Sequence, residues 1–247
     1  MDFLNGILFI DIETASGVPD YNSLPEGLKA EWDKKSRLVK PTRDDIKDPA
    51  DLFTDRAGIF SEFARIVCIS FGVIVGDDEN RRLRLRSLAG DDEKKILEDL
   101  CVVIEKITAR HKDFRFCGHN IKEFDIPFIC RRMVINNIPL PSCLQLSGRK
   151  PWEITHLDTL ELWKFGDNKN YTSLSLLAQV LGIPSPKDDI DGSQVGHVFW
   201  QEKDIARISR YCMQDVFTTA KVFLRLKGID PTNLRPDYAE GFTLDSL

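Results

Sequence analysis

The sequence predicts an α/β protein with a mixed five-stranded sheet, three antiparallel strands followed by parallel ones, and helices on both faces. Three strand-like apolar segments come first, at residues 7–11, 66–75 and 82–88, and the turn sequence GDDEN joins the second to the third. Helical and strand-like patterns then alternate, which is typical of parallel strands covered by helices. These two patterns together indicate the fold class.

The second half of the chain supplies the alternating elements. The first predicted helix starts after two aspartates and repeats its apolar residues every three or four positions. Gly182 and Gly228 stand where the last two helices should end. In chain order, the expected elements are a helix at 91–110, a strand at 114–118, a helix at 124–136, a strand at 155–159, and helices at 173–182 and 201–227.

Length and composition fit one domain that spans residues 1–247. The chain is 42% hydrophobic and 30% charged, as in soluble globular proteins. It has no run near the roughly 18 apolar residues of a membrane span, and no secretory signal. Its six cysteines form no C-x-x-C pair and fit reduced core residues. We therefore expect a cytoplasmic protein with no membrane partner.

A segment at about 15–63 separates two strands that would otherwise form a hairpin. It leaves directly from the end of the first strand and carries an amphipathic pattern of its own. Loops this long are often functional, so a lid over a site and a purely packing role are equally good interpretations. The tail after residue 228 shows no regular pattern, and we expect it to be irregular.

The first strand ends in two carboxylates. In ILFIDIETAS, residues 7–16, a run of apolar residues leads into Asp11 and Glu13. Residues two apart on a strand share a face, so these acids would raise each other's pKa unless a cation lay between them. Alone, a D-x-E triplet is common and fits two solvated acids at the surface. It indicates a site only when other acids join it.

Two later stretches supply such acids. In GHNIKEFDIPF, residues 118–128, Asp125 stands at the start of a helix, where an acid is also favourable as a simple cap. In RYCMQD, residues 210–215, Tyr211 and Asp215 are four apart and share one helix face. That pair also fits a core tyrosine with an exposed aspartate. Each stretch alone is weak evidence for a site.

The three motifs in this order resemble those of the DEDD superfamily of 3′–5′ exonucleases, whose fold is ribonuclease H-like. They are D-x-E at the end of a first strand, N-x-x-x-F-D at a strand–helix junction and Y-x-x-x-D on a late helix. Tyr211 fits the tyrosine branch (DEDDy), because the histidine branch has H-x-x-x-x-D and position 210 is Arg210. The resemblance runs from Asp11 to Asp215. It looks closest to stand-alone predicted exonucleases related to the proofreading domain of family-B DNA polymerases.

The resemblance implies a two-metal-ion mechanism that releases nucleoside 5′-monophosphates from a 3′ end. Two divalent ions, Mg²⁺ or Mn²⁺, would stabilise the attacking and leaving oxygens from positions roughly 3.5–4 Å apart. By resemblance, Asp11 would bridge both ions, and Glu13 and Asp215 would complete the site of the attacking water. Asp125 would hold the second ion. Tyr211 would orient the water, and with a pKa of about 10 it is a poor base at neutral pH.

Three further residues are expected by resemblance to contact the substrate. Thr14 would lie near the terminal nucleotide, and Asn120 and Phe124 would touch or stack on the last bases. Core packing is the competing interpretation for Phe124. Asp158 is expected to cap or end local structure, outside the metal site. The polar loop at 164–173 fits a solvated loop better than a phosphate contact.

The expected partner is single-stranded nucleic acid, with DNA favoured over RNA. The net charge of −5 argues against a broad non-specific nucleic-acid coat, but not against an enzyme that holds a few phosphates through metal ions. A separate polymerase or a repair protein is a further candidate partner. The same carboxylates would serve an RNA 3′-end trimming enzyme. A catalytically silent nucleic-acid-binding module is the non-enzyme alternative, and the presence of all four acids and the tyrosine argues against it.

Overall fold

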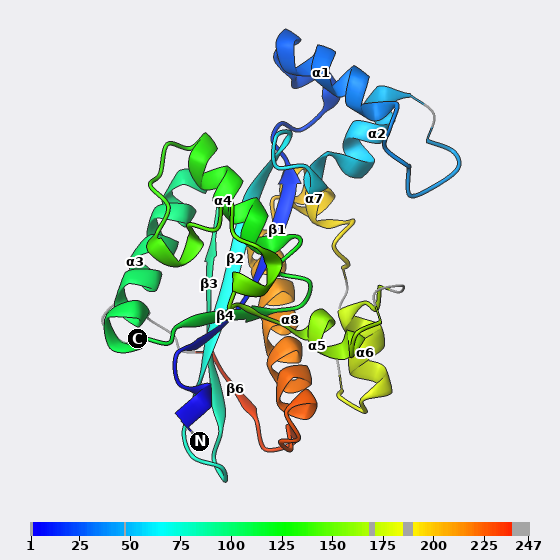
Figure 1. Cartoon of the computed structure of the whole chain (residues 1–247). Helices are drawn as coiled ribbons and strands as arrows, with labels where there is room; N and C mark the ends of the chain where they lie inside the picture. The colour runs from blue at the N-terminus through cyan, green and yellow to red at the C-terminus, as the bar shows by residue number, and fades with distance from the viewer. Residues whose placement is uncertain (1, 47, 168–170, 185–189, 239–247) are drawn as a thin grey trace.

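The computed structural model describes residues 2–46, 48–167, 171–184 and 190–238. Their centre is a mixed sheet with the strand order β5-β4-β1-β2-β3-β6 (Figure 1). β1, β2 and β3 are antiparallel, and β4 and β5 run parallel to β1, as predicted. The strands are β1 (Ile7–Ser16), β2 (Ala64–Val75), β3 (Arg82–Ala89), β4 (Arg115–Gly118), β5 (Leu157–Asp158) and β6 (Arg235–Tyr238).

The sheet of the described residues has six strands, so the prediction of five is wrong. β6 pairs in parallel with β3 at the edge of the sheet, in the tail that we expected to be irregular. Its sequence, RPDY, shows no apolar alternation, and proline is tolerated there because the strand lies at an edge. Asp237 also lies 3.7 Å from Arg84 of β3 in an ion pair. Backbone pairing and this ion pair hold the strand without a hydrophobic pattern.

β1 is longer than the strand predicted at 7–11. It continues to Ser16 and stays paired with β2, with a bulge between Glu13 and Thr14. Two acids within the strand interrupt the apolar run, which is why hydrophobicity alone ends it too early. The segment between β1 and β2 therefore begins at residue 17.

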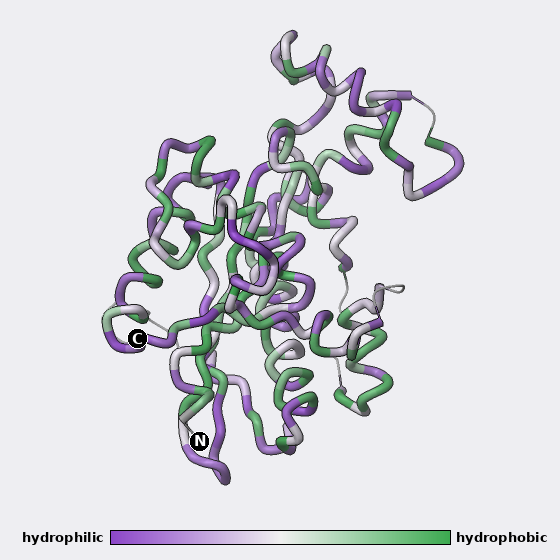
Figure 2. The backbone as a smooth tube through the Cα atoms, viewed as in Figure 1, coloured by the Kyte–Doolittle hydropathy of each residue, from purple (hydrophilic) through white to green (hydrophobic). Residues whose placement is uncertain are grey.

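Helices cover both faces of the sheet, as predicted. α3 (Glu93–Arg110) and α4 (Asp125–Ile135) pack on one face, and α8 (Ile205–Leu226) packs on the other (Figure 1). Figure 2 shows hydrophobic residues along the central strands and on the helices beside them. Successive residues of β1 alternate between the two cores, with Leu8 and Ile10 towards α3 and α4 and Phe9 towards α8.

The last helix begins later than the predicted residue 201. A short helix, α7 (Val195–His197), runs into a π-helical turn at Val198–Glu202, and Lys203 then adopts a left-handed conformation with φ 58°. Asp204 starts α8 anew, because its side chain accepts a hydrogen bond from the backbone of Arg207 at 2.9 Å. Among the described residues, no helix combines the length and the apolar character that a membrane span requires.

Shorter elements complete the fold. α5 (Thr159–Lys164) and α6 (Leu174–Val180) lie against α8. The described 3₁₀ turns are Asp2–Leu4, Tyr21–Ser23, Ala57–Ile59, Ser142–Leu144 and Pro151–Glu153.

The insertion between β1 and β2 forms two helices around a small core of its own. These are α1 (Glu26–Ser36) and α2 (Pro49–Arg56), which stand beyond the end of β1 in Figure 1. The ring of Trp32 is fully buried and lies 5.2 Å from Phe53 and 5.1 Å from Phe63, centroid to centroid. The insertion is therefore a packed substructure at the C-terminal end of β1.

Candidate active site

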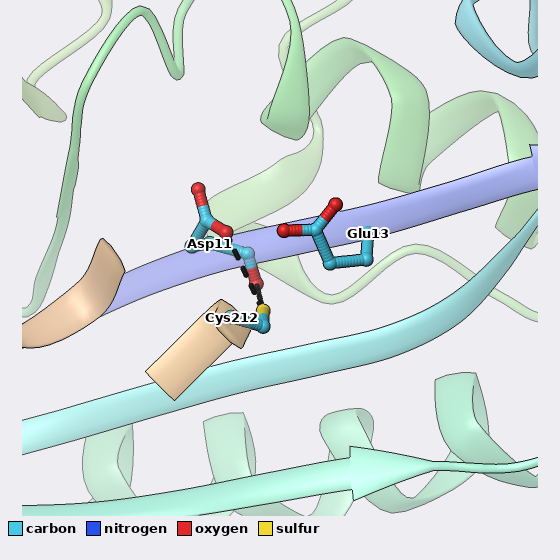
Figure 3. Close-up of side chains that lie close together, drawn as sticks. All are labelled: Asp11, Glu13 and Cys212. Atoms are coloured by element: carbon cyan, nitrogen blue, oxygen red, sulfur yellow. Dashed lines mark hydrogen bonds between the residues drawn. The ribbon is translucent and has the colours of Figure 1, made fainter. Parts of the chain in front are cut away.

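β1 carries Asp11 and Glu13 on the sheet face that α8 covers, while Ile12 points into the core of the opposite face. Glu13 is buried and Asp11 is half-buried. One potential ligand atom from each of Asp11, Glu13 and Cys212 lies within 4.8 Å of the others (Figure 3). The strand alternation therefore places the two carboxyl groups side by side, as the sequence predicts.

α4 brings Asp125 to the same strand. Asp125 is the first residue of α4, and its Oδ1 accepts a hydrogen bond from the backbone nitrogen of Ile12 at 3.1 Å. β4 pairs with β1 only at residues 7–9, nearer the N-terminus of β1. The backbone nitrogen of Ile12 lies beyond this pairing, and the Asp125 carboxylate supplies its hydrogen-bond partner. Gly118 leaves room for the turn that leads into α4, because a Cβ there would lie 1.9 Å from Ile121 Cγ2 in that turn and 2.9 Å from the carbonyl oxygen of Ile10 in β1.

α8 supplies Tyr211 and Asp215. The two residues are one helical turn apart, and the tyrosine hydroxyl donates a hydrogen bond to the aspartate. Both side chains line a cavity of about 880 Å³ together with Asp11. The three motifs of the sequence, which span most of the chain, thus meet around one end of α4 and one face of α8.

The carboxyl groups act on one another electrostatically. Burial, followed by the charges of Asp125 and Asp215, raises the pKa of Asp11 well above its ordinary value. Burial and the charge of Asp11 do the same to the pKa of Glu13. Burial raises the pKa of Asp125 to about 7, although the hydrogen bond from β1 opposes the shift. Burial and the charge of Asp215 raise the pKa of Tyr211, so its hydroxyl keeps its proton.

The donor set fits hard divalent cations. Four carboxyl groups from β1, α4 and α8 supply oxygen ligands, which Mg²⁺ and Mn²⁺ prefer. Among the described residues, the charged groups that act most strongly on Asp11 and Glu13 are other acids and the Cys68 thiol, and none is positive. Positive charge from metal ions would therefore offset both the cost of burying these carboxylates in their charged form and the repulsion between them.

Cys212 has a role in the site that the sequence does not reveal. Its Sγ donates to the carbonyl oxygen and to Oδ2 of Asp11, at 3.4 Å in each case (Figure 3). Burial raises the pKa of this thiol, so it remains a neutral donor that orients Asp11. As expected from the sequence, Cys212 is a buried cysteine with a free thiol. Its place three residues before Asp215 is the only sequence signal for the added contact.

Two of the predicted substrate residues lie at the edges of the site. The hydroxyl of Thr14 donates to the carbonyl oxygen of Gly58 at 2.7 Å and so ties β1 to the insertion. Phe124 is half-buried and packs on Phe128, with ring centroids 5.4 Å apart. Neither side chain is among the described residues that line the cavity beside Asp11. Their contacts with substrate stay predictions.

Asp158 caps local structure, as predicted. Its Oδ1 accepts hydrogen bonds from the backbone nitrogens of Asn120 and Leu160, both at 2.9 Å, and its Oδ2 accepts one from Lys122 at 3.1 Å. Asn120, the third predicted substrate residue, is held in this turn with φ 61°. Asp158 also contributes to the raised pKa of Asp125. Its substantial hydrogen bonding to the backbone fits a capping role.

His119 and Tyr171 line the same cavity as Asp11, which the sequence does not predict. Their rings lie 6.4 Å apart. His119 Nδ1 lies 2.9 Å from the hydroxyl of Thr159, and its Nε2 lies 2.8 Å from the carbonyl oxygen of Thr172. The imidazole thus anchors the loop that carries Tyr171. A polar loop has no period from which the cavity-facing side chain could be predicted.

Comparison with known proteins adds a family context. Residues 59–242 match a family described as predicted 3′–5′ exonucleases related to the exonuclease domain of PolB. The matched residues begin after β1 and leave Asp11 and Glu13 outside. No curated protein matches the chain.

A solved structure resembles the fold. It is the family B DNA polymerase from the hyperthermophilic archaeon Pyrobaculum calidifontis, with a TM-score of 0.53 and 15% sequence identity. The match covers 90% of this chain and 24% of the polymerase chain. The present chain thus spans about a quarter of the length of that polymerase, and the likeness supports the ribonuclease H-like α/β fold.

Proposed function

This chain belongs to the family of predicted 3′–5′ exonucleases related to the exonuclease domain of PolB, and from that membership we propose a metal-dependent exonuclease of the tyrosine branch that degrades single-stranded DNA. As a 3′–5′ exonuclease it is a phosphodiester hydrolase. It would release nucleoside 5′-monophosphates one at a time. The observation that carries the proposal is the convergence of four carboxyl groups, because burial, and then the charges of Asp125 and Asp215, raise the pKa values of Asp11 and Glu13.

Asp11, Glu13, Asp125 and Asp215 would hold two Mg²⁺ or Mn²⁺ ions. When bound, such ions lower the pKa of water and stabilise charge on the leaving oxygen. The protein supplies fixed ligand positions, because the backbone of β1 orients Asp125 and the thiol of Cys212 orients Asp11. Partners of this kind restrict ligand movement and favour a preorganised site.

Tyr211 would orient the attacking water beside Asp215. Its raised pKa keeps the hydroxyl protonated at neutral pH, so it cannot act as the base; with its one proton donated to Asp215, its oxygen can accept a hydrogen bond from the water. The hydrogen bond to Asp215 fixes the direction of that hydroxyl. The role is therefore one of positioning rather than of proton abstraction.

The cavity beside these residues supports a strand of nucleic acid as substrate. Its volume of about 880 Å³ is large enough for a nucleotide, and the exposed ring of Tyr171 offers a surface on which a base can stack. Thr14, Asn120 and Phe124 remain proposed contacts with the last nucleotides. A polymerase or repair protein on a separate chain is the proposed partner.

The substrate is tested with 5′-labelled single-stranded DNA and RNA of the same base sequence, in Mg²⁺ or Mn²⁺. We expect DNA to shorten from its 3′ end faster than RNA. Faster shortening of RNA would replace DNA by RNA as the substrate, since contacts with the 2′-hydroxyl distinguish the two. Cleavage of neither strand, with metal binding intact, would favour a nucleic-acid-binding module.

A further inference from the structure

A second cavity lies between the insertion and the end of β1. Its volume is about 290 Å³, and its walls come from β1 at residues 14–16, from α2 and the turn after it, and from α7 and the turn after it. The segment at 190–196 separates it from the larger cavity, because its first residues line the larger cavity and its later residues line the smaller. The smaller cavity therefore begins one residue after Glu13.

Arg56 brings a positive charge into this cavity. It is the last residue of α2, and its side chain is half-buried with a fully buried Nε. Within the part of the chain that the structure describes, its guanidinium forms no hydrogen bond or ion pair. A buried donor without a partner is unfavourable. The side chain is only half-buried and lines the cavity, so the part of the guanidinium outside the buried Nε can meet an anion that enters it.

The other charged side chains of the cavity wall have partners already. Asp55 accepts hydrogen bonds from the backbone and the hydroxyl of Thr42. His197 lies 3.5 Å from Glu202. Among the described residues that line the cavity, Arg56 is thus the one permanently charged side chain left without a partner.

The core of the insertion fixes the position of Arg56. α2 packs into that core through Phe53, which is fully buried against Trp32. The turn after α2 is tied to β1, where the carbonyl oxygen of Gly58 accepts the hydroxyl of Thr14 at 2.7 Å. The guanidinium is therefore attached to a rigid element that is itself anchored beside the carboxylate cluster, which lowers the entropic cost of binding.

We propose that this cavity binds one nucleotide of the substrate strand, next to the scissile bond, with its phosphate on Arg56; the inference rests on the proposed exonuclease function. A guanidinium can donate two parallel hydrogen bonds to a phosphate. The volume of about 290 Å³ lies just below the roughly 300–1,000 Å³ of ligand sites, so the cavity has room for at most one nucleotide. Trp200, held to the carbonyl oxygen of Ser16 at 3.0 Å, lines the rest with hydroxyl-bearing residues. The insertion is thus a substrate-binding element.

Binding of labelled single-stranded DNA tests the proposal without cleavage. Fluorescence anisotropy is measured on Asp11→Asn protein, with and without Arg56→Gln, over a range of KCl concentrations. We expect Arg56→Gln to raise Kd about tenfold, as for loss of a charged hydrogen bond. The slope of log K against log salt should become shallower by about 0.7, because one phosphate contact with a single strand is lost.

Two further variants keep the test decisive. Arg37→Gln is the matched control, because it removes the same charge from an exposed side chain of the insertion outside this cavity. Gly196→Glu adds a bulky, negatively charged side chain at a residue of the cavity wall, where a Cβ would meet nothing within 4 Å. It should weaken binding about as much as Arg56→Gln, with thermal unfolding unchanged. It also decides the question if Arg56→Gln fails to fold.

Equal binding by the Arg56→Gln and Arg37→Gln proteins would overturn the proposal, and so would normal binding by Gly196→Glu. The proposed exonuclease function fails by a different result, namely no 3′ shortening of any oligonucleotide by the wild-type protein. If the wild-type protein cleaves and the Arg56→Gln protein binds DNA normally, only the proposed nucleotide site is overturned and the exonuclease function stands.

Discussion

The surroundings of Asp11 disfavour its charged form, because its carboxyl group is partly removed from water and lies near two other acids. Burial and the charges of Asp125 and Asp215 raise its pKa, and burial raises the pKa of Asp125 to about 7. Carboxyl groups of the unfolded chain have pKa values of about 4 and release their protons above that pH. In the folded protein, Asp11 and Asp125 keep their protons to higher pH. For Asp125, the resulting contribution to stability is fully present below about pH 4 and is lost as the pH rises through about 7.

We predict that the Tm of the metal-free protein falls from about pH 5 to about pH 8 and that Mn²⁺ reduces this fall. Asp11→Asn should raise the metal-free Tm at the upper pH by about 5 °C, because it removes one buried like charge. Calorimetry in EDTA measures both effects. Asp44→Asn, at an exposed acid of the insertion, is the control. A lower Tm for Asp11→Asn would contradict the electrostatic explanation.

Tyr211→Phe removes one hydroxyl and little volume. Since that hydroxyl donates to Asp215, a proposed metal ligand, we predict a fall in kcat of about 10-fold to 100-fold. The Kd for single-stranded DNA should stay unchanged. The pH–rate profile should keep its shape, because the hydroxyl is protonated throughout the working range. If the pH–rate profile of Tyr211→Phe lacked a high-pH limb that the wild-type profile has, Tyr211 would instead act as the base.

At the scale of elements, Gly118 lets the turn before α4 lie close to the end of β4 and to β1. A Cβ at this position would meet Ile121 Cγ2 at 1.9 Å and the carbonyl oxygen of Ile10 at 2.9 Å. We predict that Gly118→Ala lowers the free energy of unfolding by about 1–3 kcal/mol and reduces activity further by displacing Asp125. Urea denaturation measures the first effect.

Gly27→Ala is the matched control for that substitution. Gly27 lies in α1, and a Cβ there has nothing within 4 Å. The change should be neutral or stabilising by about 0.5–1 kcal/mol, since alanine favours a helix over glycine. Equal effects of the two substitutions on the free energy of unfolding would show that crowding at Gly118 does not cause the loss of stability.

Elements with a strong hydrophobic period are predictable from the sequence. α3 is predicted at 91–110 and found at Glu93–Arg110. β6 is missed because backbone pairing, rather than apolar alternation, defines it. The start of α8 is misplaced because one left-handed residue, Lys203, separates it from a π-helical turn. A local backbone break of this kind leaves the hydrophobic pattern almost unchanged.

At the scale of the whole molecule, the sheet order explains how distant motifs meet. β1 lies beside β4, so the helix that follows β4 begins next to the carboxylates of β1, and α8 lies across the same strand. The family resemblance of the three motifs predicts their convergence, and the sheet order provides it. The contacts of Cys212, His119 and Tyr171 join residues far apart in sequence with no periodic signal. They could be found only in three dimensions.

The proposed function requires the carboxylate cluster to perform metal-dependent 3′–5′ hydrolysis. The most direct measurement follows 5′-labelled single-stranded DNA with wild-type and Asp11→Asn protein, in Mg²⁺ and in EDTA. We predict a one-nucleotide ladder from the wild type in Mg²⁺ only, and a kcat about 1,000-fold lower for Asp11→Asn, since several kcal/mol of transition-state stabilisation are lost. Equal rates for the two proteins, or shortening that persists in EDTA, would contradict the proposed function.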